Sequence, residues 1–138
     1  MNFKKGWFHT EITPLSKKLA EEAILKNDFT NGDFTKKLES EFSKILNIPT
    51  VLYSNSGTSA ISLALLALEI GRGNIIATSG VGWIATIQAA KLTGSEVMVF
   101  DVEKNLPKLD IDELIKSKDK FDAIIPVNYN GRQIDIRA

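Results

Sequence analysis

Apolar positions in the first third of the chain recur at the three- and four-residue spacing of a helix. Thr13 and the proline after it have the residue types of an N-cap and a first helical position, and they predict a helix that ends near Asn27. A second amphipathic pattern begins at Phe34 and stops at Asn47, shortly before another proline. We therefore expect residues 1–49 to form a helical segment.

From residue 50 onward the pattern changes to short, almost continuous apolar runs separated by helical stretches. Strands that are buried on both faces of a sheet have this composition, so the pattern predicts an α/β fold with a mostly parallel sheet and flanking helices over residues 50–138. The predicted strands are 51–53, 74–78, 96–100 and 123–127. The predicted helices are 58–70, closed by Gly71, 83–92, closed by Gly94, and 111 to about 118, capped by Asp110 or Asp112.

The composition narrows the class of partner. Of the 138 residues, 43% are hydrophobic and 25% are charged, and the formal net charge is zero. A neutral protein has no overall field that attracts nucleic acid or an anionic membrane, so we expect neither partner. The chain has no cysteine and no apolar run long enough to cross a bilayer, and its first twenty residues lack the apolar middle of a signal peptide. We therefore expect a cytoplasmic protein without a disulfide or a thiolate metal site.

The turn between the first predicted strand and its helix, residues 54–59, is small and rich in hydroxyl groups. One interpretation of Ser56, Gly57 and Thr58 is a helix N-cap, which the tripeptide alone favours. The other is a phosphate pocket, because uncovered N–H groups and the positive end of the helix dipole attract anions. The lack of bulky side chains favours the pocket. No lysine follows the glycine as in a Walker loop, and the turn has no Gly-x-Gly-x-x-Gly run.

A second polar turn, residues 79–82, follows the next predicted strand along the chain. Because ligands of open α/β sheets bind at the carboxyl ends of the strands, we expect the two turns to lie near one another. Trp83 comes directly after this turn, which contains Gly80 and Gly82. A place in the core and a stacking contact with a flat heteroaromatic ligand are both open for Trp83, since its position alone does not separate them.

Other polar residues are weaker candidates for chemistry. His9 is the only histidine, and no second ligand beside it indicates a metal site. Asp101 ends a predicted strand, where an acidic residue caps a turn as readily as it contacts a ligand. Residues 128–131 follow the last predicted strand and could line a pocket. The charged residues between Lys116 and Asp122 are expected to be a solvated helix end.

A longer series of residues resembles, in order and spacing, the amino-terminal part of the DegT type (DegT/DnrJ/StrS) of sugar aminotransferases. These are fold-type I enzymes that use pyridoxal phosphate (PLP) to aminate keto sugars bound to nucleotides. The resemblance runs from about Thr13 to the last residue and implies an incomplete large domain of that fold. The residues that carry it are Thr30, Gly32, Leu38, Glu39, Phe42, Tyr53, 56–60, 63–65, 71–73, 83–86, 99–101 and 125–131.

The resemblance implies roles for four residues. In the family the Ser-Gly-Thr turn binds the phosphate of the cofactor, which assigns that role to Gly57, Thr58 and Ser59. The aromatic residue that opens the next helix stacks on the pyridine ring, which assigns that role to Trp83. The resemblance also implies a nucleotide-linked keto sugar and an amino donor as substrates, and a homo-oligomer, with a dimer favoured.

The chain departs from the family in what it does not contain. Transamination needs a lysine that forms a Schiff base and a carboxylate that keeps the pyridine nitrogen protonated. In the family both lie beyond the segment that ends at Ala138, and no catalytic residue is assigned here. We therefore expect a truncated aminotransferase that binds PLP weakly or not at all and does not catalyse transamination alone.

Two other hypotheses remain open. The chain could be a non-catalytic binding or assembly protein that retains the fold and pairs with a full-length relative. Alternatively, a separate chain could supply the lysine.

Overall fold

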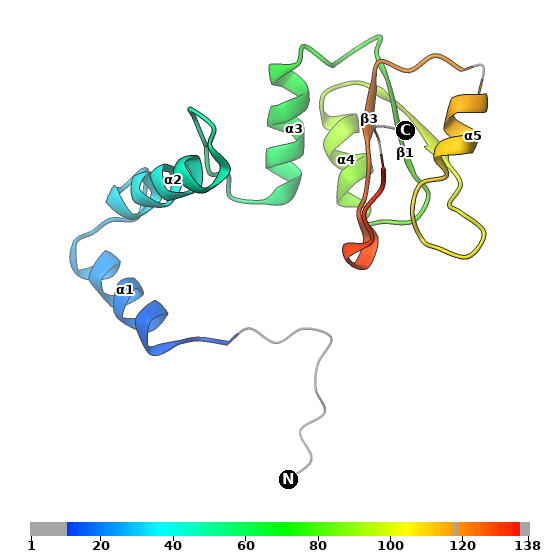
Figure 1. Cartoon of the computed structure of the whole chain (residues 1–138). Helices are drawn as coiled ribbons and strands as arrows, with labels where there is room; N and C mark the ends of the chain where they lie inside the picture. Colours follow the sequence, from blue (N-terminus) through cyan, green and yellow to red (C-terminus); the bar gives the residue numbers. More distant parts are fainter. Residues whose placement is uncertain (1–10, 118, 136–138) are drawn as a thin grey trace. The chain divides into compact units, whose positions relative to one another are not determined.

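The computed structural model describes residues 11–117 and 119–135, and these divide into two compact units after Tyr53 (Figure 1). Each unit is described by itself. The first is helical, and the second is an α/β layer structure. None of the described helices is both long and apolar enough to cross a membrane.

The first unit consists of helix α1 (Pro14–Leu25) and helix α2 (Asp33–Leu46). The Thr13 hydroxyl accepts a hydrogen bond from the Ser16 N–H at 3.1 Å, and proline occupies the first helical position, as predicted. Helix α2 ends where Asn47 adopts a left-handed conformation with φ 52°. The helical pattern of the sequence is therefore confirmed for the described residues of this unit.

The first unit has no buried core of its own, because no residue of α1 or α2 is buried. The Lys26 ammonium lies 2.6 Å from a Glu22 carboxylate oxygen, and this hydrogen bond lowers the pKa of Glu22. Such exposed pairs contribute little to stability. Many apolar side chains of the unit remain exposed, among them Leu15, Ile24, Leu25, Phe29, Ile45 and Leu52.

The predicted strand at residues 51–53 is wrong. These residues adopt no regular secondary structure, and the Tyr53 N–H donates to the Glu39 carboxylate at 2.9 Å instead of to a neighbouring strand. A strand exists only where a second strand accepts its hydrogen bonds, and within the described residues the only sheet is formed by other segments. An apolar run of three residues cannot form a strand without such a partner.

The second unit is built around a three-stranded parallel sheet in the order β2-β1-β3. Its strands are β1 (Ile75–Ser79), β2 (Glu96–Phe100) and β3 (Ala123–Ile125). Its helices are α3 (Gly57–Ala67), α4 (Ala85–Leu92), α5 (Ile111–Lys116) and the short 3₁₀ turn η1 (Tyr129–Gly131). In the register of the central strand, Ile76 lies opposite Val97 on one side and Ala123 on the other. The predicted mostly parallel sheet with flanking helices is confirmed.

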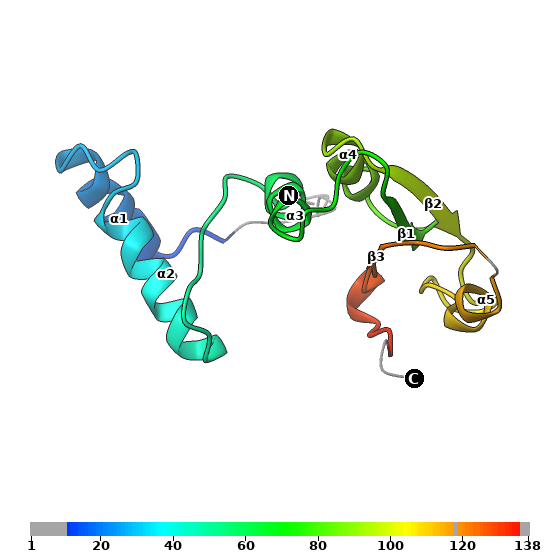
Figure 2. The same cartoon turned by 90° about the horizontal axis from the view of Figure 1, so that it is seen from above.

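Two apolar clusters cover the two faces of the sheet. Ile76 packs with Leu65 of α3 and Ala90 of α4, whereas its neighbour Ala77 packs in the opposite cluster with Leu114 of α5. Successive side chains of a strand point to opposite faces, which explains the division. Figure 2, viewed from above, shows α4 and α5 on opposite sides of the sheet. The unit therefore has three layers, with α3 and α4 on one face and α5 on the other.

Several helix ends differ from the predictions. Helix α3 is followed by a left-handed Glu69 with φ 60°, so Gly71 is not the residue that closes it. Helix α4 begins at Ala85 instead of Trp83, whereas its predicted closing residue Gly94 does have a left-handed φ of 87°. The cap of α5 is Asp110, whose carboxylate accepts from the Glu113 N–H at 3.0 Å.

Candidate functional site

The starts of α3 and α4 and the end of β3 lie at one edge of the second unit (Figure 1). Helices α3 and α4 pack side by side, and the Ser62 hydroxyl of α3 donates to the carbonyl of Ala89 in α4 at 3.0 Å. In Figure 1 both helices start at the lower end, where β3 also runs into η1. The parallel strands end at this edge, so the topology places the candidate residues where α/β sheets bind ligands.

The start of α3 contains both a helix cap and uncovered donors. The Ser56 hydroxyl accepts a hydrogen bond from the Ser59 N–H at 3.1 Å and lies 3.0 Å from the Ser59 hydroxyl. The N–H groups of Gly57 and Thr58 make no hydrogen bond to any described residue. A Cβ added at Gly57 would have no atom within 4 Å apart from its chain neighbours and the backbone of its own helix, so this end of the helix is open. The N-cap interpretation is confirmed for Ser56, and two donors remain free for an anion.

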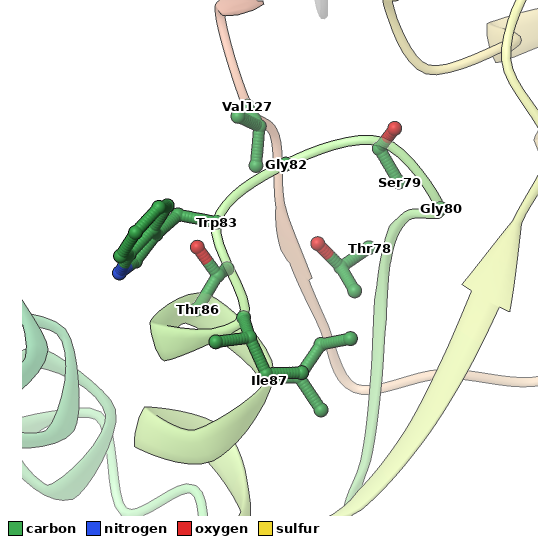
Figure 3. A pocket seen from close by; sticks show the side chains of 9 residues that line it. Thr78, Ser79, Gly80, Gly82, Trp83, Thr86, Ile87 and Val127 are labelled. Carbon is green, nitrogen blue, oxygen red and sulfur yellow. The ribbon is translucent and has the colours of Figure 1, made fainter. Parts of the chain in front are cut away.

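The turn after β1 presents Trp83 to solvent. The side chain of Trp83 is 78% exposed, so the core interpretation of this residue is wrong for this structure. Figure 3 shows the indole standing away from the turn, with Thr78 on the other side of the turn. An exposed aromatic face at the ligand edge of a sheet can stack on a flat ring.

A small pocket of about 110 Å³ lies behind the Trp83 turn. Its lining residues are Thr78, Ser79, Gly80, Gly82, Trp83, Ile84, Thr86, Ile87 and Val127. Small-molecule sites in proteins usually measure roughly 300–1,000 Å³, so this pocket would hold only part of a cofactor. Sequence reasoning missed Val127 as a lining residue, although its place at the carboxyl end of a predicted strand was a signal for it.

Thr58 and Ser59 line a different hollow, of about 340 Å³, along α3 and α4. The other residues that line it are Ser62, Leu63, Leu66, Leu92 and Thr93. The two hollows share no lining residue. The structure thus places all four predicted site residues at the starts of neighbouring helices without bringing them into one cavity.

The weaker candidates have structural partners. The Asp101 carboxylate accepts from the Val102 N–H at 2.7 Å, and the Asn128 side-chain oxygen accepts from the Ile134 N–H at 3.1 Å. Asp122 was expected to be solvated, but its carboxylate accepts from the Ile75 N–H at 2.7 Å and so ties the start of β1. No group of acidic or histidine side chains that could hold a metal is found within residues 11–117 and 119–135, and His9 lies outside them.

Lysines are missing from the lining of both hollows. Lys91 lies in the last turn of α4, and the Lys108 ammonium pairs with the Glu103 carboxylate at 2.8 Å. Within the described residues, neither hollow therefore has an amine in its wall that could form a Schiff base with a bound aldehyde.

Comparisons with known proteins agree with the arrangement of the second unit. Residues 11–138 match the model of the DegT/DnrJ/EryC1/StrS aminotransferase family. A candidate sugar aminotransferase from Streptococcus pneumoniae, solved in its PLP form, is 25% identical with a TM-score of 0.82, over 91% of this chain and 32% of that chain. GDP-4-keto-6-deoxymannose-3-dehydratase with a trapped PLP-glutamate geminal diamine is 25% identical with a TM-score of 0.77, over 87% and 33%.

An aminotransferase from Psychrobacter cryohalolentis has the same fold, with a TM-score of 0.80 at 22% identity, over 89% of this chain and 32% of that chain. At that identity the likeness concerns the fold alone. The chain spans about a third of the length of these solved relatives. The incomplete α/β domain predicted from the sequence is thereby confirmed.

Proposed function

Because the chain belongs to the DegT/DnrJ/EryC1/StrS aminotransferase family, we propose that it supplies the cofactor-side part of a PLP-dependent nucleotide-sugar aminotransferase. One observation carries the proposal. The free N–H groups of Gly57 and Thr58 open the helix that packs beside α4, and the exposed Trp83 lies just before α4. N–H donors for a phosphate and an exposed aromatic face, both at one edge of the sheet, suit a phosphorylated ring.

The residues present fit the phosphate end of PLP. Gly57 and Thr58 each offer an N–H at the positive end of α3. The space beside Gly57 is open, because no other segment comes within 4 Å of a Cβ added there. Ser59 contributes less in our proposal, because its N–H is already held by Ser56. The Ser59 hydroxyl is available if its contact with the Ser56 hydroxyl is exchanged for a phosphate oxygen.

Trp83 fits the ring end of PLP. Its indole would stack on the pyridine and exclude water from one face of the ring. When bound, PLP supplies an electron sink for the bonds of an amino donor. Neither hollow is lined by a lysine, so we propose that these 138 residues hold the cofactor weakly and do not catalyse transamination by themselves.

The substrates are proposed from the relatives. The solved relatives include a candidate sugar aminotransferase and a dehydratase of a GDP-linked keto sugar. We infer for this family member a nucleotide-linked keto sugar and an amino donor as substrates. Because the chain has no cysteine, we propose that it works in the reducing cytoplasm.

A second function, binding or assembly without catalysis, is favoured by the exposed apolar side chains. None of the residues of α1 and α2 is buried, and Leu63, Leu66 and Leu92 are exposed on α3 and α4. Copurification with a full-length aminotransferase would favour this function over a fragment that has only lost its activity.

The test of the proposed phosphate site compares Gly57→Ala with Gly57→Pro. Proline is well tolerated at the first helical position, and Ser56 before it is extended with φ −159° and ψ 157°, as a residue before proline must be. Gly57→Pro thus removes one N–H donor while the helix is kept. Gly57→Ala is the matched control, because it adds a Cβ in open space and keeps the donor.

Binding is measured by titrating pyridoxamine phosphate, which has no aldehyde to react with lysines, and following the emission of Trp83 in a Trp7→Phe background. We expect Gly57→Ala to bind like the parent and Gly57→Pro to bind about tenfold more weakly, because a hydrogen bond to a charged group is lost. The parent protein should bind pyridoxamine, which has no phosphate, more weakly than either variant binds pyridoxamine phosphate. Equal affinity of the two variants would overturn the proposed phosphate site.

A further inference from the structure

The hydroxyl of Thr78 is buried at the point where β1 ends. Thr78 is only 1% exposed, and its hydroxyl donates to the carbonyl of Ile125 at the end of β3 at 2.9 Å. In Figure 3 this hydroxyl points toward β3. A buried hydroxyl would lose its hydration without a compensating hydrogen bond, so this bond joins the two strand ends tightly.

The rest of the turn is tied to both neighbouring strands. The Gly80 N–H donates to the carbonyl of Phe100 at the end of β2 at 2.8 Å. A Cβ at Gly82 would lie 3.4 Å from both methyl groups of Val127, so the backbone of Gly82 passes close to the segment that follows β3. The Ser79 hydroxyl accepts a hydrogen bond from the Val81 N–H at 3.2 Å and donates one to the Val81 carbonyl, also at 3.2 Å. The turn is therefore anchored at its start and along its length.

The Trp83 carbonyl accepts a hydrogen bond from the Thr86 N–H at 3.0 Å, but its indole makes no hydrogen bond to any described residue. Its side chain is largely exposed, and α4 begins only at Ala85. The direction of the indole therefore depends on the backbone of the turn that precedes it.

We propose that Thr78 is a positioning residue for Trp83, with its hydroxyl fixing β1 against β3 so that the turn holds the indole in one orientation at the ligand edge. The expected effect on cofactor affinity rests on the proposed function, because a fixed indole strengthens binding only if it stacks on a cofactor. Its structural part concerns the protein alone. Thr78 itself contacts no reacting group in this proposal.

The experiment labels Trp83 with 5-fluorotryptophan in a Trp7→Phe background and records its ¹⁹F NMR signal without any cofactor. We expect one narrow resonance for the parent and for Thr78→Ser, which keeps the hydroxyl. Thr78→Val keeps the shape but loses the donor, so its resonance should broaden or split as the ring samples more than one environment. Affinity for pyridoxamine phosphate should fall between about twofold and tenfold in Thr78→Val and recover in Thr78→Ser.

Ser95→Ala is the matched control for lost stability. The Ser95 side chain is 5% exposed and its hydroxyl donates to the carbonyl of Gly71 at 3.0 Å, at the other end of the sheet, just before β2 begins. This variant should lower the unfolding midpoint without changing the Trp83 resonance. An unchanged resonance in Thr78→Val, or an equal change in Ser95→Ala, would overturn the positioning role.

The NMR readout separates this inference from the proposed function. If the resonance changes in Thr78→Val but the parent does not bind pyridoxamine phosphate, the positioning role is supported and the proposed cofactor site is contradicted. If pyridoxamine phosphate binds but the resonance is unchanged in Thr78→Val, the cofactor site is supported and the positioning role is contradicted.

Discussion

At the scale of single residues, the start of α3 shows how one short motif can serve two purposes. The Ser56 hydroxyl caps the helix through the Ser59 N–H, while the donors of Gly57 and Thr58 stay free of described partners. The two interpretations of the tripeptide are therefore compatible, because they concern different N–H groups. A phosphate at this site would be bound by the free N–H groups of Gly57 and Thr58, because the Ser59 N–H already donates to Ser56.

The cap makes a prediction about stability. Ser56→Ala should lower the free energy of unfolding by about 1 kcal/mol, because the Ser59 N–H loses its acceptor, whereas Ser56→Gly should cost only a few tenths. Urea unfolding followed by circular dichroism measures both. If alanine and glycine cost the same, the hydroxyl contact seen here does not stabilise the helix in solution.

Local chemistry explains which features of the fold could be predicted from the sequence. Thr13, Asn47, Gly94 and Asp110 end or begin their helices as predicted, because a cap depends only on neighbouring backbone groups. The residue types at the start of α3 likewise pointed to donors for an anion. The exposure of Trp83 could not be predicted, since burial depends on what other segments cover.

At the scale of elements, the missed features all depend on contacts between distant segments. The apolar run at 51–53 is not a strand, because the described chain offers it no pairing partner. Asp122 was grouped with a solvated charge run, yet it accepts from Ile75, 47 residues away in the chain. Leu109 lies in a loop before α5 and nevertheless belongs to the core, because it packs in one cluster with Ala77 of β1 and Leu114 of α5.

Leu109 gives a prediction at this scale. Its side chain is fully buried, at 0% exposure, and packs with Phe100 and Leu114. Leu109→Ala should therefore lower the free energy of unfolding by roughly 2–5 kcal/mol, through lost burial and the cavity that remains. Leu106→Ala in the same loop is the control, since Leu106 is 39% exposed and should cost much less. A similar cost for both, measured by denaturant unfolding, would mean that the loop does not close the core.

At the scale of the whole molecule, many large apolar side chains of the described residues are exposed. Both units contribute, with large apolar side chains exposed on α1 and α2 and others on α3 and α4. Isolated exposed apolar residues are ordinary, but side chains grouped on one helix face mark a contact surface. Leu63, Leu66 and Leu92 line one hollow together and form such a group.

This group predicts self-association, with a dimer favoured. The 15.2 kDa chain should elute above its monomer mass in size-exclusion chromatography with light scattering, and the apparent mass should rise with concentration. Leu63→Gln combined with Leu66→Gln should shift the equilibrium toward the monomer, because it removes apolar area from the shared surface. Leu15→Gln combined with Leu25→Gln on α1 is the matched control, with the same chemistry on another exposed helix. If the α1 pair lowers the mass as much as the α3 pair, association is nonspecific, and a parent chain that stays monomeric at every concentration would contradict the prediction altogether.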